Sequence, residues 1–309
     1  MKKEAKAADV LLLIVAGIWG FTFVTVQNAV SFLEPHAFNT IRFSIAALLL
    51  IIWLLLFNRS QLKEVHKYSI KAGIILGVFL FIGYSFQTIG LVYTTSSKAG
   101  FITGLSVILV PLFLFIFYQT KLTANNIIGA LSATVGLYLL TLANAVSVNI
   151  GDLYVFICAI GFALQIIFTG KYTSSYPTLL LTIIQLATVS ILSFAASFLF
   201  ENTTNNFQLS ILYQKEVWFA LLITSVFATA LAFIIQTGVQ KYTTSTRVAL
   251  IFAMEPVFAA ITAYFYNQER LLSSAWIGCA LILAGMILAE IPFRKRMKLT
   301  KQKVRHLNE

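Results

Sequence analysis

Charged residues are scarce in this chain. Asp, Glu, Lys and Arg together make up 11% of the 309 residues, while hydrophobic residues make up 59%. An ordinary soluble domain carries about 25% charged residues, because its surface must be solvated by water. The mean hydropathy of +0.87 agrees with this deficit. These values exclude a water-soluble fold and indicate that lipid surrounds most of the protein.

Cysteine and histidine are also rare, which limits the available chemistry. The two cysteines, Cys158 and Cys279, lie in apolar runs, and the three histidines lie in expected loops or the tail. Their spacing fits neither a disulfide framework nor a metal site, so we predict no metal and no cofactor. The apolar runs contain no nucleophile–base pair and no pair of carboxylates, so no catalytic residue is predicted.

Ten apolar stretches are long enough to cross a bilayer as helices, which takes roughly 20 residues each. They cover residues 9–30, 38–57, 70–93, 97–118, 122–142, 151–170, 178–200, 217–240, 246–266 and 271–292. Short connections with turn-forming and polar residues separate them. We therefore predict an all-α integral membrane fold with ten transmembrane helices.

The positive charges are distributed unevenly between these connections. If the first stretch begins in the cytoplasm, eighteen Lys and Arg lie on the cytoplasmic side, and only Lys98, Lys215 and Arg270 lie on the outer side. The positive-inside rule then predicts a plasma-membrane protein with cytoplasmic N and C termini. The net charge of +11 forms no stripe with interleaved aromatic residues, so nucleic acid is not an expected partner.

The chain contains an internal repeat. Residues 87–136 align with residues 236–285 without gaps, and twelve of the fifty positions are identical. The identical positions include Gln87 with Gln236, and a Tyr-Thr-Thr-Ser run that opens at position 93 and again at position 242. Self-similarity of this length indicates that the fold is built from two copies of one unit.

Each copy contains five predicted helices, so the second copy begins on the opposite face of the membrane. We place the first repeat at 8–142, the second at 151–292, and a basic cytoplasmic tail at 293–309. Inverted five-helix repeats of this kind recur in secondary carriers, whose halves exchange conformations so that one site opens to either side in turn. An old duplication that now serves only packing is the alternative.

Six short segments follow one another along the chain in an order that is typical of one family. They are Trp19-Gly20, Arg42-Phe43, Ser97 to Gly104 with Pro111, Glu255 to Phe258, Gln268 to Leu271, and Ile277 to Gly285. In this order they resemble the EamA-type ten-helix exporters of the drug/metabolite transporter superfamily. The resemblance implies two EamA domains, a central cavity between them and transport of small organic solutes, without fixing the solute. One departure is that Glu269 corresponds to Thr120 in the first repeat.

Glu255 is the sharpest candidate for a functional residue inside a predicted helix. An ionisable side chain at mid-bilayer costs roughly 3 kcal/mol on insertion scales, so it needs a reason to be there. The next residue, Pro256, has no N–H and leaves the carbonyl of Phe252 without its helical donor. A carboxyl beside a freed carbonyl offers a site for a cation or a proton. A structural carboxyl bonded to neighbouring helices is the alternative.

Other polar side chains lie inside the predicted helices, often at helical spacing. Arg42 could bind a substrate carboxylate or phosphate with its planar guanidinium, or could snorkel to the membrane interface. The predicted substrate-binding residues are Trp19, Arg42, Tyr84, Gln87, Ser106, Gln165, Gln185, Gln236 and Glu255, with Glu255 also binding the coupling ion. Amides that only join helices, at roughly 0.6 kcal/mol for each hydrogen bond, are the alternative.

Together these features predict a secondary transporter that works by alternating access. We expect an exporter of a small organic metabolite, either an amino acid or a drug-like solute. The expected partners are that solute, membrane lipid and protons, and the expected state is a monomer or a weak homodimer. A gradient-independent facilitator or channel is the first alternative, and an intramembrane enzyme is a weaker one.

Overall fold

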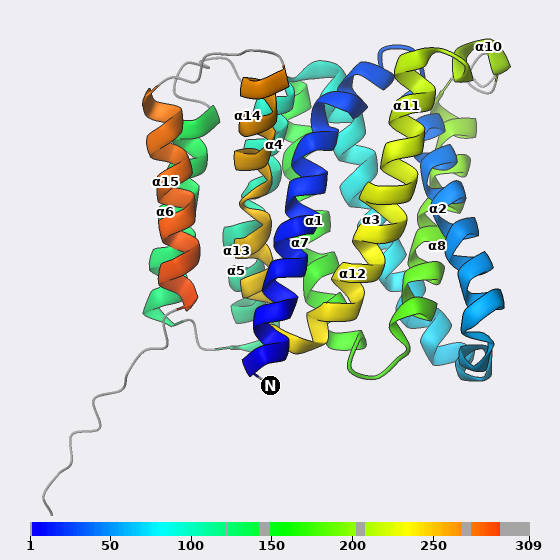
Figure 1. Cartoon of the computed structure of the whole chain (residues 1–309), viewed down its shortest axis with the longest axis horizontal. Coiled ribbons are helices and arrows are strands. Elements are labelled where there is room, and N and C mark those ends of the chain that lie inside the picture. Colours follow the sequence, from blue (N-terminus) through cyan, green and yellow to red (C-terminus); the bar gives the residue numbers. More distant parts are fainter. Residues whose placement is uncertain (1, 121–122, 142–148, 202–207, 267–272, 291–309) are drawn as a thin grey trace, which may run out of the picture.

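A computed structural model describes residues 2–120, 123–141, 149–201, 208–266 and 273–290. Within these ranges all regular structure is helical, and the long helices run side by side along one direction (Figure 1). Helices suit such apolar segments because each helix satisfies its own backbone hydrogen bonds, which lipid cannot do.

The first half of the chain supplies five spanning segments. Their helices are α1 (Lys2–Ala29), α2 (Pro35–Phe57), α3 (Lys67–Tyr93), α4 (Ser96–Gly104) followed by α5 (Ser106–Tyr118), and α6 (Ala124–Thr141). A short 3-10 helix, η1 (Arg59–Glu64), connects α2 to α3. The α2 helix begins with a proline at its first position, where the missing N–H costs no helical hydrogen bond.

The second half supplies five more spanning segments. Its elements are α7 (Ile150–Tyr172), α8 (Thr178–Phe200), α10 (Leu209–Leu212), α11 (Lys215–Ile223), the π-helical η2 (Thr224–Leu231), α12 (Ala232–Val239), the 3-10 helix η3 (Gln240–Tyr242), α13 (Ser245–Phe252), α14 (Glu255–Tyr266) and α15 (Ser273–Glu290). The segments α11, η2 and α12 follow one another directly and form one crossing.

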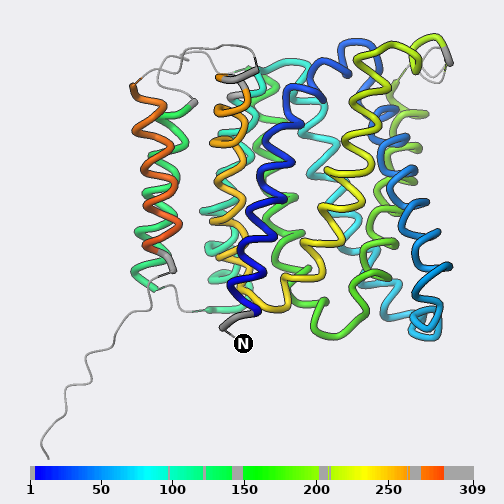
Figure 2. Tube along the Cα trace, in the orientation of Figure 1, coloured from blue at the N-terminus to red at the C-terminus, as the bar shows by residue number. Residues whose placement is uncertain are grey.

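The helices confirm the all-α membrane fold predicted from the sequence. Among the described residues, eight helical segments are long and apolar enough to cross a bilayer, and α6 and α15 contain shorter apolar stretches. The N-terminus and the end of α15 lie at the same face of the bundle (Figure 2). The predicted tail at 293–309 lies outside the described residues.

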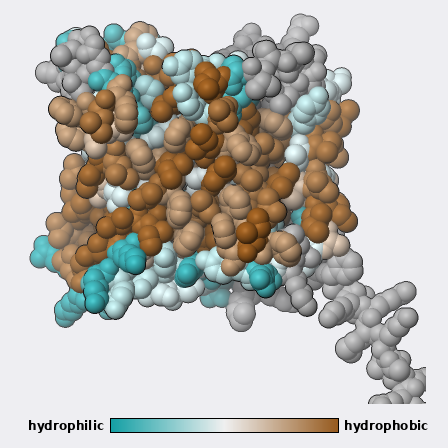
Figure 3. Space-filling view, turned by 180° about the vertical axis from the view of Figure 1, so that it is seen from behind, coloured by the Kyte–Doolittle hydropathy of each residue, from teal (hydrophilic) through white to brown (hydrophobic). Residues whose placement is uncertain are grey.

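The outer surface of the bundle is apolar around its middle. A hydrophobic belt covers the face shown in Figure 3, and hydrophilic residues gather toward its upper and lower edges. Phe57, Phe198 and Phe200, for example, expose more than half of their surface. Water would not stabilise so many exposed aromatic rings, whereas lipid chains do. The protein is therefore a multi-pass membrane protein.

The two halves pack against each other in a symmetric pattern. Helix α2 packs on α8 and α6 packs on α15, and in each pair the two helices hold the same position in their repeats. Helix α3 packs on α7, and the reciprocal contact joins α12 to α1. An approximate two-fold relation therefore links the halves throughout their interface.

Glycines allow the closest of these contacts, between α6 and α15. A Cβ atom on Gly278 would lie 2.5 Å from the carbonyl oxygen of Gly136, and one on Gly285 would lie 2.6 Å from that of Gly129. Gly129 and Gly136 are the repeat equivalents of Gly278 and Gly285. Small residues let backbones approach in lipid, where packing replaces the hydrophobic effect as the driving force.

Replacing Gly278 with alanine is expected to destabilise the protein by about 1–3 kcal/mol, because the new methyl group cannot fit without moving the backbone of α6. Thermal unfolding of the detergent-purified protein measures this loss. The matched control is Gly238→Ala, because a Cβ there meets no atom within 4 Å. Equal unfolding temperatures for the two variants would contradict the packing argument.

Two of the spanning segments are interrupted near their middle. The first breaks between α4 and α5 at Leu105, and the second breaks between α13 and α14 at Ala253 and Met254. The amides of Leu105 and Met254 bond to carbonyls three residues back, which tightens the chain locally. Since these two residues are equivalent in the repeat, both halves carry the same break.

Only one of the two breaks has an evident cause in the local sequence. Pro256 occupies the second position of α14, where a proline ends the preceding helix but suits the next one. The first repeat has Val107 at the equivalent position. The prediction that Pro256 disturbs its helix thus agrees with the break, whereas the apolar pattern of 97–118 gave no sign of an interruption.

Candidate functional site

The broken helices border a cavity of about 40 Å³ between the two halves. Both breaks border it, through the residues that precede and follow them. Its walls are Trp19, Leu80, Tyr84, Gln87, Gly100, Thr103, Gly104, Ser106, Phe162, Gln165, Ile166, Phe233, Gln236, Phe252, Glu255 and Pro256. Its place between the halves and its mixture of apolar and polar walls make it the candidate functional site.

The repeat relates opposite walls of this central cavity. Four pairs of lining residues occupy equivalent positions, namely Tyr84 with Phe233, Gln87 with Gln236, Thr103 with Phe252, and Ser106 with Glu255. The cavity therefore lies on the approximate two-fold axis. The last pair breaks the symmetry of charge, since it sets a hydroxyl opposite a carboxyl.

A smaller cavity of about 20 Å³ adjoins the central one. Its walls are Trp19, Thr22, Phe23, Val26, Arg42, Tyr84, Gln87, Leu91 and Glu255. Four of these residues, Trp19, Tyr84, Gln87 and Glu255, also line the central cavity. Glu255 thus lies at the junction of the two, with Arg42 in the smaller one.

The structure brings together most of the residues predicted to bind substrate. Seven of them line the central cavity, namely Trp19, Tyr84, Gln87, Ser106, Gln165, Gln236 and Glu255. Arg42 lines the smaller cavity, and Gln185 lies behind Gln165. Among the described residues, no three His, Cys, Asp or Glu side chains are grouped as a metal site requires.

Arg42 is held inside the bundle. Its Nε donates to Thr229 Oγ1 at 2.7 Å, and its Cζ lies 4.6 Å from the centre of the Tyr84 ring and 5.3 Å from that of Phe43. With 3% of its surface exposed, the side chain does not snorkel to the interface, which removes one of the two predicted alternatives. Stacking on aromatic rings and the hydrogen bond of Nε fix the guanidinium at the wall of the smaller cavity.

The partner of Arg42 comes from the π-helical segment η2. The carbonyl oxygen of Ala228, within this segment, accepts hydrogen bonds from Trp19 Nε1 at 2.8 Å and from Arg42 Nη2 at 3.5 Å. π-Helical turns are rare and frequently lie at functional sites. Here the altered turn fixes two side chains that border the cavities.

Aromatic rings form the apolar walls of the central cavity. Trp19 packs against Phe252 at a centroid distance of 4.9 Å and against Phe233 at 5.5 Å, and Tyr84 packs edge-on against Phe162 at 5.1 Å. The three phenylalanines were missed from the sequence, because 27 Phe residues serve lipid and interior alike. The repeat held a signal for one of them, since Phe233 is the equivalent of Tyr84.

A chain of amides forms one polar wall. Gln236 Nε2 donates to Gln165 Oε1 at 3.1 Å, Gln165 Nε2 donates to Gln185 Oε1 at 3.3 Å, and Gln185 Nε2 donates to Thr237 Oγ1 at 3.2 Å. Gln236 Oε1 is buried and has no hydrogen-bond partner within the described ranges. The chain thus ends in an amide at the cavity with capacity for one more hydrogen bond. On the opposite wall, Gln87 Nε2 donates to Thr103 Oγ1 at 3.3 Å.

Replacing Gln165 with leucine is expected to cost about 1–3 kcal/mol of stability, because it leaves buried amide groups of Gln185 and Gln236 without partners. Thermal unfolding in detergent measures the loss. Ser197→Ala is the control, since it removes a buried hydroxyl that has no hydrogen-bond partner in the described part of the chain. If both variants unfolded at the same temperature, the amide chain would make no measurable contribution to the stability of the protein.

Comparison with known proteins identifies the family. The EamA-like transporter family model matches residues 6–142 and again residues 149–290. An uncharacterized transporter of Archaeoglobus fulgidus is 35% identical over 284 residues, which cover 92% of this chain and 86% of that protein. The uncharacterized transporter YoaV of Bacillus subtilis is 23% identical over 288 residues, which cover 90% and 95% of the two chains.

The fold is also found in solved structures, of which one crystal structure is an example. It matches with a TM-score of 0.74 at 20% identity, and the match covers 92% of this chain and 96% of that one. The names of the relatives point to a transporter rather than an enzyme. The resemblance found in the sequence is thereby confirmed, and the chain belongs to the EamA-like transporter family.

Proposed function

We propose that this protein is a secondary transporter that carries a small organic solute through the central cavity by alternating access. The observation that supports this most directly is the meeting of two broken helices, one from each half, at a single cavity. In carriers with inverted repeats, discontinuous helices at equivalent positions mark the binding site. The solute would exchange its hydration for the amides and the carboxyl at these breaks.

The cavity chemistry favours an amino acid with an apolar side chain, and a drug-like amine is the second choice. The carboxyl of Glu255 can pair with an ammonium group, and the guanidinium of Arg42 can pair with a carboxylate in the adjoining cavity. The aromatic walls around Trp19 suit an apolar body. A solute with only an ammonium group would use Glu255 without Arg42.

Protons are the proposed coupling ion. Of the residues that line the two cavities, Glu255 is the only acid, so a proton and a cationic solute would compete for one carboxyl. Competition for one group is the simplest way to couple two fluxes, because binding of one excludes the other. We propose export from a plasma membrane with both termini in the cytoplasm, which agrees with the excess of Lys and Arg in the connections on that side.

Comparing the medium metabolites of cells with and without the protein would identify candidate solutes. Flux of each candidate is then measured in proteoliposomes, with and without a pH gradient. Saturable flux that responds to the gradient is the expected result. Saturable flux without that response would leave a facilitator, flux that does not saturate would indicate a channel, and no flux of any solute would overturn the proposal.

A further inference from the structure

In the part of the chain that the structure describes, two ion pairs join the halves of the bundle. Lys98 in the first turn of α4 pairs with Asp152 in the first turn of α7, with Nζ 3.4 Å from Oδ2. Arg247 in the first turn of α13 pairs with Asp9 near the start of α1 through Nη2 and Oδ2. Because α4 and α13 begin at opposite faces of the bundle, one pair lies toward each end of the protein (Figure 1).

The repeat relates these two ion pairs to each other. Lys98 and Arg247 are equivalent positions, and each follows a threonine whose hydroxyl accepts a hydrogen bond from its amide at 3.3 Å, Thr95 and Thr244 respectively. In both pairs the cation belongs to the fourth spanning segment of one repeat and the acid to the first spanning segment of the other. The same type of contact therefore lies at both ends of the bundle.

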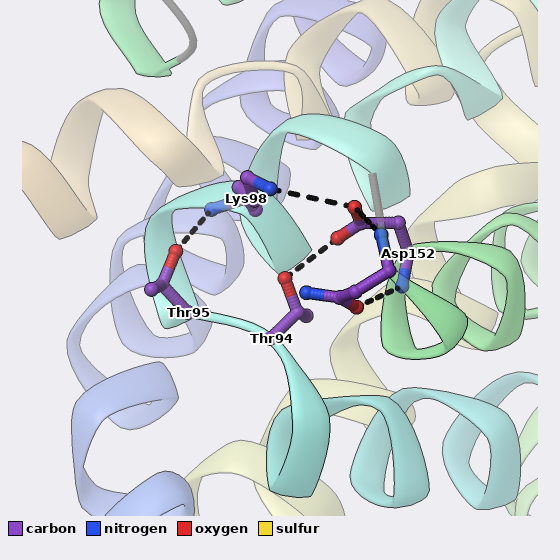
Figure 4. A network of polar contacts seen from close by, with 5 residues as sticks. Thr94, Thr95, Lys98 and Asp152 are labelled. Atoms are coloured by element: carbon purple, nitrogen blue, oxygen red, sulfur yellow. Dashed lines mark hydrogen bonds and ion pairs between the residues drawn. The ribbon is translucent and has the colours of Figure 1, made fainter. Parts of the chain in front are cut away.

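The pair of Lys98 and Asp152 is built into a wider polar network (Figure 4). Thr94 Oγ1 donates to Asp152 Oδ1 at 2.6 Å, and the backbone amide of Asn149 donates to Asp152 Oδ2 at 2.9 Å. Lys98 and Asp152 each expose only 9% of their surface. This network joins the end of α3, the start of α4 and the start of α7 at one point.

We infer that the two ion pairs are alternating latches: Lys98–Asp152 closes the cavity toward the face away from the N-terminus, and Arg247–Asp9 closes it toward the other face. The inference rests on the transport cycle proposed above. Both latches are closed in this structure. Because the halves are inverted, opening one face parts α4 from α7 while α13 stays on α1, and opening the other face does the reverse.

The position of the latches explains how they would control access. Gly100, one half-turn after Lys98, lines the central cavity, and so does Phe252 of α13, which begins beside Arg247. Parting either helix from its partner therefore widens the cavity on that side. If the ion pairs only stabilised the fold, breaking one pair or the other would not change access to the cavity in opposite directions at the two faces.

The latches are tested by the accessibility of the cavity from each face. A reporter cysteine, Ser106→Cys, is placed in the cavity wall of a protein in which Cys158 and Cys279 are alanine. Membrane-impermeant methanethiosulfonate is applied to right-side-out and to inverted vesicles. We expect Lys98→Gln to raise labelling from the face away from the N-terminus about fivefold relative to the other face, and Arg247→Gln to shift the ratio about fivefold in the opposite direction.

Rescue distinguishes a latch from a stabilising contact. The charge-exchanged variant Lys98→Asp/Asp152→Lys should restore the labelling ratio of the unaltered latch. If the labelling ratio is the same in both single variants as in the unaltered protein, or shifts in the same direction in both, the latch proposal is wrong. The proposed transport function would not be affected by that result. A reporter that is labelled from neither face in any variant would contradict the transport cavity, and with it both the proposed function and the latches.

Discussion

Replacing Glu255 with glutamine is expected to lower solute flux driven by a pH gradient at least about tenfold. Glutamine keeps the size of the side chain, but it cannot release or take up a proton. Carboxyls inside the bilayer serve as proton relays in pumps and transporters because their charge is costly there and a proton removes it. If the proton and the solute compete for this carboxyl, the variant loses coupling before it loses binding.

The experiment compares flux in proteoliposomes with and without a pH gradient, for the unaltered protein and for Glu255→Gln. Exchange of labelled for unlabelled solute in the absence of a gradient needs no net proton movement, so it should persist in the variant. It should need a higher solute concentration, because the ammonium group of the solute has lost its ion pair. Glu216→Gln is the matched control, since Glu216 is exposed in the first turn of α11 and lines neither cavity. An undiminished response to the gradient in Glu255→Gln would end the case for coupling through this residue.

The repeat offers a second test of the same carboxyl. Ser106 is the equivalent of Glu255 and lines the same cavity. Combining Glu255→Ser with Ser106→Glu therefore moves the carboxyl to the opposite side of the approximate two-fold axis. We expect part of the gradient response to return, because the conformational exchange treats the two positions alike. If the exchanged variant were as inactive as Glu255→Gln, the function of the carboxyl would depend on the residues that surround position 255 in the second half.

The sequence determined most of the architecture, because lipid imposes simple rules. An apolar run of about 20 residues must be a helix when no water can satisfy its backbone, so ten stretches predicted ten crossings. Since each repeat contains five predicted helices, an odd number, the second half had to be inverted. The π-helical turn in η2 was not predictable, since the apolar run Thr224–Leu231 is equally compatible with a regular helix.

The candidate site was predictable as a set of residues but not as a geometry. Polar residues inside apolar stretches are costly enough to stand out, which is why Gln87, Gln165 and Gln236 were found. The sequence could not show whether the Arg42 side chain lies inside the bundle or reaches the membrane interface, because its partner Thr229 lies 187 residues away in the chain. Phe252 was missed because apolar residues at a cavity wall have no local mark that separates them from those facing lipid.

Replacing Arg42 with glutamine is expected to reduce transport at least about tenfold and to destabilise the protein. The substitution removes a charged hydrogen bond to Thr229, typically about 1.5–3 kcal/mol, and the stacking on Tyr84, about 2 kcal/mol when desolvated. It also leaves the charge of Glu255 in the adjoining wall without its nearby opposite charge. Flux in proteoliposomes and thermal unfolding in detergent measure the two losses.

The double variant Arg42→Gln/Glu255→Gln separates packing from charge. Removing one member of a buried charge pair is costly because the other member stays uncompensated, whereas removing both leaves no buried charge. The double variant should therefore unfold at a higher temperature than Arg42→Gln, although it transports no better. Arg59→Gln is the control, because Arg59 is exposed in η1 and such surface changes usually stay within about 0.5 kcal/mol. A double variant no more stable than Arg42→Gln would mean that the two charges do not sense each other, and that Arg42 stabilises the bundle only through Thr229 and Tyr84.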